Sequence, residues 1–402
     1  MFRTGSFPRG FVLACGLASA VLVPADSGAA KGFHLVYTFQ DGADGAAPHD
    51  GLIKDASGNF YGTTFYGGNT QLGRGTAFKL TASGSKTLLH SFSGGTDGGL
   101  PVGLVLDSSG NLYGTTQQGG VIGGCNSNGC GVAYELAPDG TETVLYTFSG
   151  GADGAFPMGA LLADGKGDFY GTTNGGGADK WGTVFELSAD GTETVVHSFA
   201  SGSDGLGPQA GLIADKKGNM YGTTQEGGGG CAKFGCGTVF EITPTGTETV
   251  LYAFTGGTDG GNPVAGLISD KSGNFYGTTE FGGDAGGCGG MGCGTVFKFA
   301  PGGKLTVLYT FTGGTDGGQP VGALKRDMRG NLFGTTLFWG AGYGVAFKLA
   351  PDGQERVLHS FTNGDDGAYP WGALLEDGKD GFFSTASGGG STDFGTVFKL
   401  GK

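Results

Sequence analysis

Short apolar runs rich in aromatic and β-branched residues recur along the whole chain, separated by Gly, Asp, Asn and Pro. No window sustains the 3.6-residue period of an amphipathic helix. In one representative stretch the expected strands are a (210–214), b (219–224), c (237–242) and d (249–254). Phe, Tyr, Val and Leu occur on both sides of the alternation, so both faces of these strands are expected to be buried. The pattern predicts an all-β fold.

The runs belong to a repeat. The phrase Phe-x-x-Gly-x-Asp-Gly-x-x-Pro occurs seven times, followed in most copies by an Asp-x-x-Gly-Asn-like turn, Tyr-Gly-Thr-Thr and Gly-Thr-Val-Phe. Four strands in roughly 50 residues are typical of one β-propeller blade. The prolines that anchor the seven copies are Pro48, Pro101, Pro157, Pro208, Pro263, Pro320 and Pro370.

The two ends of the repeat region complement each other. Residues 33–39 resemble a strand d without a preceding strand c, and residues 395–400 resemble a strand c without a following strand d. Pairing them would close a ring and leave no open sheet edge. We therefore predict a seven-bladed β-propeller with four strands per blade, closed by strands 33–39 and 395–400. The alternative is an open solenoid, which would need capping repeats instead.

These motifs give the chain a family resemblance. The combination of Tyr-Gly-Thr-Thr, Gly-Thr-Val-Phe and Gly-Gly-x-Asp-Gly resembles the GloVer tandem-repeat family of secreted bacterial proteins, the choice-of-anchor group. The resemblance implies an extracytoplasmic location, and it carries no established activity. It also implies a C-terminal anchor in many members, for which the sequence shows no segment. Weaker similarities exist to kelch repeats, through pairs such as Gly67-Gly68, and to NHL propellers, through Asp107-x-x-Gly110-Asn111.

The first thirty residues differ from the rest. Arg3 and Arg9 precede an apolar run from Phe11 to Val23 and then small residues, the layout of a cleaved secretory signal. The alternative is a lipid anchor at Cys15. We expect a signal peptide at 1–30, a single propeller domain at 31–402, and an extracellular or periplasmic location.

Composition limits the possible partners. The 92 Gly and 13 Pro would suit a disordered chain, but 30 Phe, 13 Tyr and 3 Trp with only 15% charged residues favour a folded one. The net charge of −13 disfavours nucleic acid and anionic membranes, which are bound through Lys and Arg. No stretch after the leader is apolar enough to span a bilayer. We expect a monomer.

Six cysteines follow the leader, as three C-x4-C pairs between strands b and c. In an exported chain they predict three local disulfides, and zinc ligation is the alternative. Such small loops would stabilise the fold by at most ~2 kcal/mol each, so their main expected effect is to fix loop shape. The pairs are Cys125/Cys130, Cys231/Cys236 and Cys288/Cys293.

Propeller geometry places the b–c and d–a loops at one face and the a–b and c–d turns at the other. An aspartate recurs in each d–a loop, and we interpret it as capping its own turn. Calcium binding is the alternative, although each copy supplies one carboxylate where six to eight oxygens are needed. We expect no cofactor. The seven aspartates are Asp44, Asp97, Asp153, Asp204, Asp259, Asp316 and Asp366.

Residues that break the sevenfold pattern are better candidates for function, since a repeated residue must first serve the blade. The predicted ligand-binding residues are Trp339, Trp371, Trp181, Glu226 and Glu280. His49 and Asp50 are adjacent in a strand and would point to opposite faces, which argues against acid–base work. His90, His197 and His359 replace a recurrent Tyr, and we interpret them as surface residues of strand d.

We assign no catalytic residue. The leading hypothesis is a non-enzymatic binding or scaffold module for a glycan, a cell-envelope component or a protein. The alternative is a glycan hydrolase or lyase at the channel mouth. Two carboxylates about 5–10 Å apart in a pocket would favour hydrolysis. A shallow face lined by Trp and Tyr would favour binding.

Overall fold

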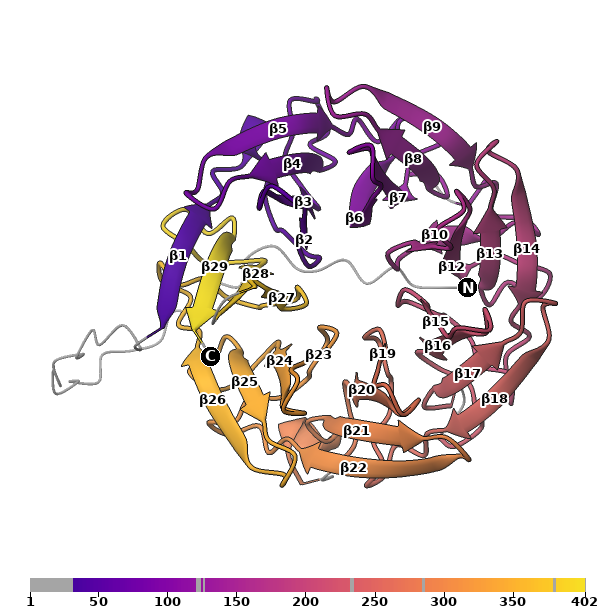
Figure 1. Cartoon of the computed structure of the whole chain (residues 1–402), viewed down its shortest axis with the longest axis vertical. Coiled ribbons are helices and arrows are strands. Elements are labelled where there is room, and N and C mark those ends of the chain that lie inside the picture. Colours follow the sequence, from indigo (N-terminus) through magenta and orange to yellow (C-terminus); the bar gives the residue numbers. More distant parts are fainter. Residues whose placement is uncertain are drawn as a thin grey trace, which may run out of the picture.

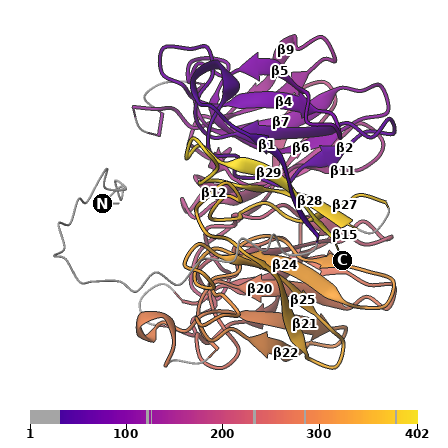
Figure 2. The same cartoon turned by 90° about the vertical axis from the view of Figure 1, so that its left-hand side faces the viewer.

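Seven antiparallel sheets stand in a ring around a common axis (Figure 1). The computed structural model describes residues 32–120, 124–125, 127–231, 235–283, 286–378 and 381–401. The expected signal peptide at 1–30 lies outside the described residues. Each sheet runs from strand a at the axis to strand d at the rim, and the ring seen from its edge carries loops at both faces (Figure 2). The fold is the seven-bladed β-propeller that the repeat predicts.

The strands of the first four blades are as follows. Blade 1 contains β2 (Ile53–Lys54), β3 (Phe60–Thr64), β4 (Thr76–Leu80) and β5 (Lys86–Ser91). Blade 2 contains β6 (Gly99–Leu106), β7 (Leu112–Gln118), β8 (Val132–Leu136) and β9 (Glu142–Thr147). Blade 3 contains β10 (Ala155–Pro157), β11 (Leu162–Ala163), β12 (Phe169–Gly175), β13 (Thr183–Leu187) and β14 (Glu193–Ser198). Blade 4 contains β15 (Ile213–Ala214), β16 (Met220–Thr224), β17 (Thr238–Ile242) and β18 (Glu248–Ala253).

The last three blades complete the ring. Blade 5 contains β19 (Ile268–Ser269), β20 (Phe275–Thr279), β21 (Thr295–Ala300) and β22 (Lys304–Thr310). Blade 6 contains β23 (Lys325–Arg326), β24 (Leu332–Thr336), β25 (Val345–Leu349) and β26 (Glu355–Ser360). Blade 7 contains β27 (Leu375–Glu376), β28 (Gly381–Ala386), β29 (Thr396–Gly401) and β1 (Phe33–Thr38). In the described ranges the helical elements are two single 3-10 turns, η1 (Gly42–Asp44) and η2 (Cys288–Gly290), and none of the helices there could span a membrane.

The ring closes as predicted. Strand β1 pairs antiparallel with β29, from Phe33 opposite Leu400 to Thr38 opposite Thr396. In Figure 1 the first strand of the chain lies beside the last one. The N-terminal strand therefore supplies strand d of the blade whose other three strands come from the C-terminus.

The innermost strand is shorter than predicted. In blade 4, residues 210–214 were expected to pair, but β15 covers only Ile213–Ala214. The preceding residues bond sideways instead: Ala210 O accepts the Thr172 hydroxyl of blade 3 at 3.0 Å. Because no β-carbon separates them, Gly211 also lies against the backbone of Ala160 in blade 3. Contact between neighbouring blades thus replaces strand pairing near the axis.

The core lies between the blades. The phenylalanine that opens each repeat phrase is completely buried, and its ring packs edge-on or tilted against an aromatic ring in strand c of the following blade, with centroids 5.0–5.3 Å apart. Such pairs add to the stabilisation from burying the rings. The seven pairs are Phe39–Phe78, Phe92–Tyr134, Phe148–Phe185, Phe199–Phe240, Phe254–Phe297, Phe311–Phe347 and Phe361–Phe398.

The glycine that precedes Thr-Val-Phe joins neighbouring blades. Gly237 has φ 93°, and a β-carbon there would lie 2.6 Å from Cδ of Pro263 in the next blade. The equivalent glycine meets the next proline at all seven junctions, at 2.6–2.9 Å. Glycine is required here both for the left-handed backbone and for the space.

Candidate functional site

The b–c and d–a loops meet at one end of the ring, as the topology predicts, and we call this end the loop face. In every blade a glycine N–H of the b–c loop donates to a carbonyl of the d–a loop, as from Gly228 to Gly202 at 2.7 Å. The opposite end, formed by the a–b and c–d turns, is called the turn face. The loop face is therefore a continuous layer of hydrogen-bonded loops.

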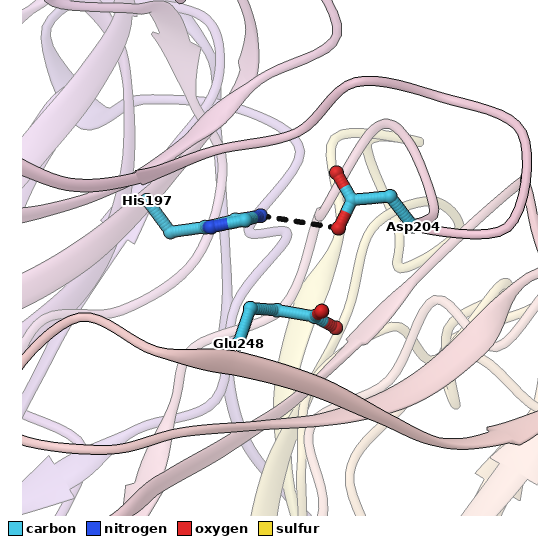
Figure 3. A group of neighbouring side chains, drawn as sticks. All are labelled: His197, Asp204 and Glu248. Carbon is cyan, nitrogen blue, oxygen red and sulfur yellow. Dashed lines mark hydrogen bonds and ion pairs between the residues drawn. The ribbon is translucent and has the colours of Figure 1, made fainter.

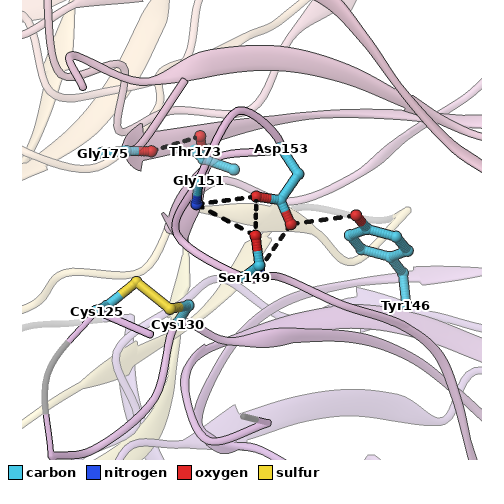
Figure 4. The surroundings of a disulfide bond; sticks show 8 residues. All are labelled: Cys125, Cys130, Tyr146, Ser149, Gly151, Asp153, Thr173 and Gly175. Atoms are coloured by element: carbon cyan, nitrogen blue, oxygen red, sulfur yellow. Dashed lines mark hydrogen bonds between the residues drawn. A yellow bond between two sulfur atoms is a disulfide. The ribbon is translucent and has the colours of Figure 1, made fainter. Parts of the chain in front are cut away.

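The d–a loops are held by their aspartates. Asp153 accepts the Ser149 N–H and hydroxyl at 2.6 Å each, the Tyr146 hydroxyl at 3.1 Å and the Gly151 N–H at 3.1 Å (Figure 4). In the other loops the recurrent aspartate likewise accepts the N–H of the residue four positions before it. These bonds agree with the turn-capping interpretation.

The histidines of strand d are half-buried, so our interpretation of them as surface residues holds only in part. His90, His197 and His359 have side chains only 19%, 18% and 12% exposed, and each Nε2 faces the aspartate of the following loop. The sequence pattern suggested exposure because strand d is outermost. The neighbouring blade covers its end instead.

All three predicted disulfides are present, with Cα–Cα distances of 5.3–5.4 Å: Cys125–Cys130, Cys231–Cys236 and Cys288–Cys293. Each cystine packs on a glycine of the d–a loop. A β-carbon on Gly256, for example, would lie 2.5 Å from both sulfur atoms of the blade 4 cystine. Figure 4 shows the corresponding cystine of blade 2 beside the Asp153 network. The disulfides thus fix the b–c loops against the d–a loops.

The second cysteine of each pair lies between strands b and c as predicted, and the structure adds that it is buried. Cys236 is only 5% exposed and belongs to a hydrophobic cluster with Phe254 and Leu267. Its counterparts Cys130 and Cys293 are completely buried. The reason is position: this cysteine directly precedes the glycine that leads into strand c, where neighbouring blades meet. The cystines therefore join the loop face to the core.

The residue before each repeat proline has a left-handed backbone. Six of these are not glycine and have φ of 53–57°. In all seven copies its N–H donates to a carbonyl in the b–c loop of the preceding blade. The conformation is held by contact between blades. These residues are Ala47, Leu100, Phe156, Gly207, Asn262, Gln319 and Tyr369.

Four aromatic side chains gather on the loop face where blades 6 and 7 meet, and we call them the aromatic cluster: Phe338, Trp339, Tyr343 and Tyr369. Phe338 is 36% exposed, and its ring centroid lies 5.9 Å from that of Trp339 and 5.5 Å from that of Tyr369. Tyr343 lies 5.7 Å from Tyr369. Three members come from the b–c loop of blade 6, and Tyr369 is a pre-proline residue of blade 7.

The backbone and a cystine support Trp339. Its φ is 65°, a strained value for a residue with a large side chain. A β-carbon on Gly318 would lie 2.9 Å from Trp339 Cε3 and 3.1 Å from Cys293 Cβ. The indole is therefore packed on glycine beside the Cys288–Cys293 disulfide of blade 5.

A second group of rings lies beside the channel and reaches it through Trp371. A cavity of about 340 Å³ runs along the axis between the inner strands, and Trp371, Met158, Gln209 and Asp50 are among its lining residues. The His49 ring stacks between Trp371 and Phe65, at 4.1 Å from each. Burial lowers the pKa of His49 to about 3, so this imidazole is neutral at physiological pH. Stacking, rather than acid–base chemistry with Asp50, is its role here.

Asp50 is the carboxylate among the described residues that line the cavity. Its Oδ2 is inaccessible to solvent and has no hydrogen-bond partner. Burial raises the pKa of Asp50 to about 7. Small residues of the other blades surround it, such as Gly159, Ala210 and Ala265.

The remaining predicted residues are dispersed. Trp181 packs against the hydrophobic cluster between blades 3 and 4. Glu226 and Glu280 follow strand b in blades 4 and 5; burial raises the pKa of both, that of Glu280 to about 7. Trp339 and Trp371 lie in different aromatic groups, and neither glutamate belongs to them.

Sequence reasoning missed the neighbours of the tryptophans. Phe338, Tyr343, Tyr369 and Phe65 were not singled out, because in a chain with 30 Phe and 13 Tyr a single ring carries little signal. Aligning the seven copies position by position would have shown Tyr369 as the tyrosine among the residues before the prolines.

The family can now be stated. The family model described as Gloeobacter/Verrucomicrobia repeat matches residues 24–233 and 230–402. The chain belongs to this repeat family. No curated protein matches the sequence.

Solved structures share the fold. The extracellular domain of the one-component system BT4673 from B. thetaiotaomicron is 10% identical with a TM-score of 0.57, and the match covers 92% of this chain and 40% of that one. The extracellular domain of the hybrid two-component system BT3049 from the same organism is 12% identical with a TM-score of 0.57, over 92% of this chain and 41% of that one. This chain therefore spans about two fifths of the length of these structures. At these identities the similarity concerns the propeller fold.

Proposed function

We propose that this protein is an exported binding module whose loop face takes a glycan, with the aromatic cluster as the platform. The observation that carries the proposal is the group formed by the exposed Phe338 and the half-buried Trp339, Tyr343 and Tyr369. Aromatic faces pack against the C–H faces of sugar rings, and tyrosine hydroxyls can bond to sugar hydroxyls at the edge. A cell-envelope component or a protein is an alternative ligand for the same surface.

The support for this site is its construction. Binding residues are commonly placed on loops held by a rigid scaffold. Here a cystine and two glycines hold Trp339 before any ligand arrives, which lowers the ordering cost of association. The three disulfides also suit an extracellular or periplasmic protein.

The second candidate, a glycan hydrolase or lyase at the channel mouth, is favoured by Asp50. A cavity carboxyl with a pKa of about 7 is suited to general-acid work. Glycoside hydrolysis by the common mechanisms needs a second carboxylate about 5–10 Å away. Among the described residues that line this cavity, Asp50 is the one carboxylate.

A glycan array probed with the mature protein tests the proposal. Phe338→Ala and Trp339→Ala should each weaken binding of the selected glycan about tenfold without lowering Tm. Tyr66→Ala is the matched control, since Tyr66 holds the position of Phe338 in blade 1 and is 53% exposed. Met328→Ala controls for the turn face, where that side chain is fully exposed.

Two outcomes would contradict the proposal. Equal binding by the Phe338 variant and wild type would remove the aromatic cluster from the site. Release of shortened glycans by wild type but not by Asp50→Asn would favour the enzyme.

A further inference from the structure

Each seam between neighbouring blades carries three equivalent positions near the rim, two of them always polar or aromatic-polar and the third variable. One is the Tyr or His of strand d, one is the aspartate of the following d–a loop, and one is a residue early in strand d of the next blade. The third position differs between seams: it is Lys86, Glu142, Glu193, Glu248, Leu305, Glu355 or Phe33. A common framework therefore presents five different residue sets at the seven seams, and the sets His-Asp-Glu and Tyr-Asp-Glu each occur twice.

The seam of blades 3 and 4 brings together three metal-ligating side chains. His197 of β14, Asp204 of the following loop and Glu248 of β18 point toward one another (Figure 3). His197 Nε2 lies 3.2 Å from Asp204 Oδ1, and each residue offers a ligand atom within 4.8 Å of the other two. Glu248 Oε1 is inaccessible to solvent and has no hydrogen-bond partner.

The same three residue types recur between blades 1 and 2, with the imidazole farther from the aspartate. His90 Nε2 lies 3.7 Å from Asp97 Oδ2 and 3.9 Å from Glu142 Oε2. The Glu142 side chain is only 10% exposed. Its Oε1 and His90 Nε2 are both buried without a hydrogen-bond partner. A largely buried carboxylate is thus directed into the cluster with its bonding capacity unused.

The charges in these clusters are unbalanced. Each has two carboxylates and one imidazole. Asp204 also has more free capacity than its counterparts, because Ala200 stands where five of the other loops have a Ser or Thr that donates its hydroxyl to the aspartate. A bound dication would balance the charge and use the free lone pairs.

We propose that His197, Asp204 and Glu248 form a binding site for a divalent transition-metal cation, with zinc as the best match, and that His90, Asp97 and Glu142 form a second one. One imidazole and two carboxylates are ligands that zinc accepts, and three protein ligands leave a position for water. Each metal would join the outer strands of two blades, which otherwise pair only within their own sheets.

Other seams of this chain are natural controls. The seam of blades 4 and 5 has Tyr252 donating to Asp259 at 3.0 Å, with Leu305 in the third position. In the seam of blades 6 and 7, His359 lies 2.9 Å from Asp366, but Phe33 stacks on the imidazole at 4.0 Å. That seam keeps the histidine and the aspartate, but it lacks the glutamate of the third position.

Calorimetric titration of the chelator-treated, tag-free mature protein with zinc chloride tests the proposal. Wild type should bind two equivalents, and His197→Tyr or His90→Tyr should each remove one. The double variant, with both His90→Tyr and His197→Tyr, should bind no zinc at these sites. These variants should fold, since tyrosine holds this position in four seams and keeps the bond to the aspartate. His359→Tyr, the matched control, should bind zinc as wild type does.

Thermal melting gives a second readout. Zinc should raise the Tm of wild type and leave the Tm of the double variant unchanged, because only a cation bound to the folded ring stabilises it. The proposal is overturned if wild type binds no zinc at micromolar concentrations, or if the double variant binds as much as wild type. If His197→Tyr removes one equivalent of zinc and His90→Tyr removes none, the second site is overturned.

Discussion

The two faces of this propeller are built by one repeat but treat variation in opposite ways. On the turn face, Asp215 Oδ1 accepts the Asn219 N–H at 3.0 Å, and the same Asp–Asn pair closes the a–b turn in four other blades. On the loop face the repeated aspartates and glycines form a similar framework, while the side chains it presents differ from blade to blade. Residues that stabilise the ring are repeated in each blade. Residues that do not stabilise it vary between blades and are available to bind ligands.

Removing the strand that closes the ring should have the largest effect, because both faces depend on the closed ring. A chain that begins at residue 41 loses β1 and with it the pairing to β29 and the buried Phe39 ring. We expect the shortened chain to melt without cooperativity. We also expect it to aggregate through the exposed β29 edge, because unpaired strands bind one another. Circular dichroism melting and size-exclusion chromatography would measure this, with a chain that begins at residue 31 as control. A soluble, cooperative product would contradict the role of closure.

The repeated framework of the loop face is tested by Asp259→Ala. This change removes acceptors for the Tyr252 hydroxyl, the Thr255 N–H and the Thr255 hydroxyl. We expect a loss of about 2 kcal/mol in the free energy of unfolding, since hydrogen bonds to a charged acceptor are lost. Urea unfolding would measure it. The control Asp190→Ala removes bonds in an exposed turn and should leave the midpoint close to wild type; equal effects would show that the d–a network adds nothing special.

The loop face itself should tolerate loss of a disulfide. Replacing Cys288 and Cys293 by Ala should lower stability by about 2 kcal/mol, because the closed loop is short and no polar group is placed in the core at Cys293. Trp339 fluorescence should change, since the indole packs beside this cystine. The matched replacement of Cys125 and Cys130 should have a similar cost in stability without changing the tryptophan emission. Identical emission from both variants would argue against the packing of Trp339.

The smallest expected effect is a pH dependence at the seams. Burial, and then Asp153, raises the pKa of Glu193 to about 7 from an ordinary value of 4.5. The folded chain therefore holds this proton through a window where the unfolded chain releases it, so the carboxyl reduces stability as pH rises from about 4.5 to 7. Partial exposure limits the effect to about 1 kcal/mol.

Urea unfolding of Glu193→Gln at pH 5 and pH 8 would measure it. The free energy of unfolding of the variant should rise relative to that of wild type at pH 8, and it should not rise at pH 5. Glu355→Gln, which changes the equivalent carboxyl between blades 5 and 6, should behave in the same way. Parallel curves for wild type and both variants would contradict the shifted pKa.

The fold could be predicted because its signals are short-range and repeated. Alternation, turn residues and the recurring prolines specify a four-stranded blade, and seven copies average out the ambiguity of any one. The half-blades at 33–39 and 395–400 specify closure, and the C-x4-C spacing specifies local disulfides. Strand a was predicted too long because its alternation continues where neighbouring blades already occupy the backbone, as at Ala210.

The candidate site was predicted only in part. Trp339 and Trp371 stood out as departures from the repeat, but Tyr369 joins Phe338 only because consecutive blades meet on the loop face. The surroundings of His197 were not predicted for the same reason, because its neighbour Glu248 belongs to the next blade. The burial of Cys236 was missed likewise, since its spacing identifies its partner but not the neighbouring blade that covers it. Alignment of repeats compares a residue with its counterparts and does not show its neighbours.

The sequence by itself determined the blade, the number of blades and the partner of each cysteine, because strand alternation, turns and C-x4-C loops act within a single repeat. The tertiary structure alone decided which side chains meet across the seven seams, and with them the aromatic cluster and the His–Asp–Glu clusters. The physical reason is that the twist and packing of the sheets around the axis set those distances, and they depend on the closed ring rather than on any local stretch of chain.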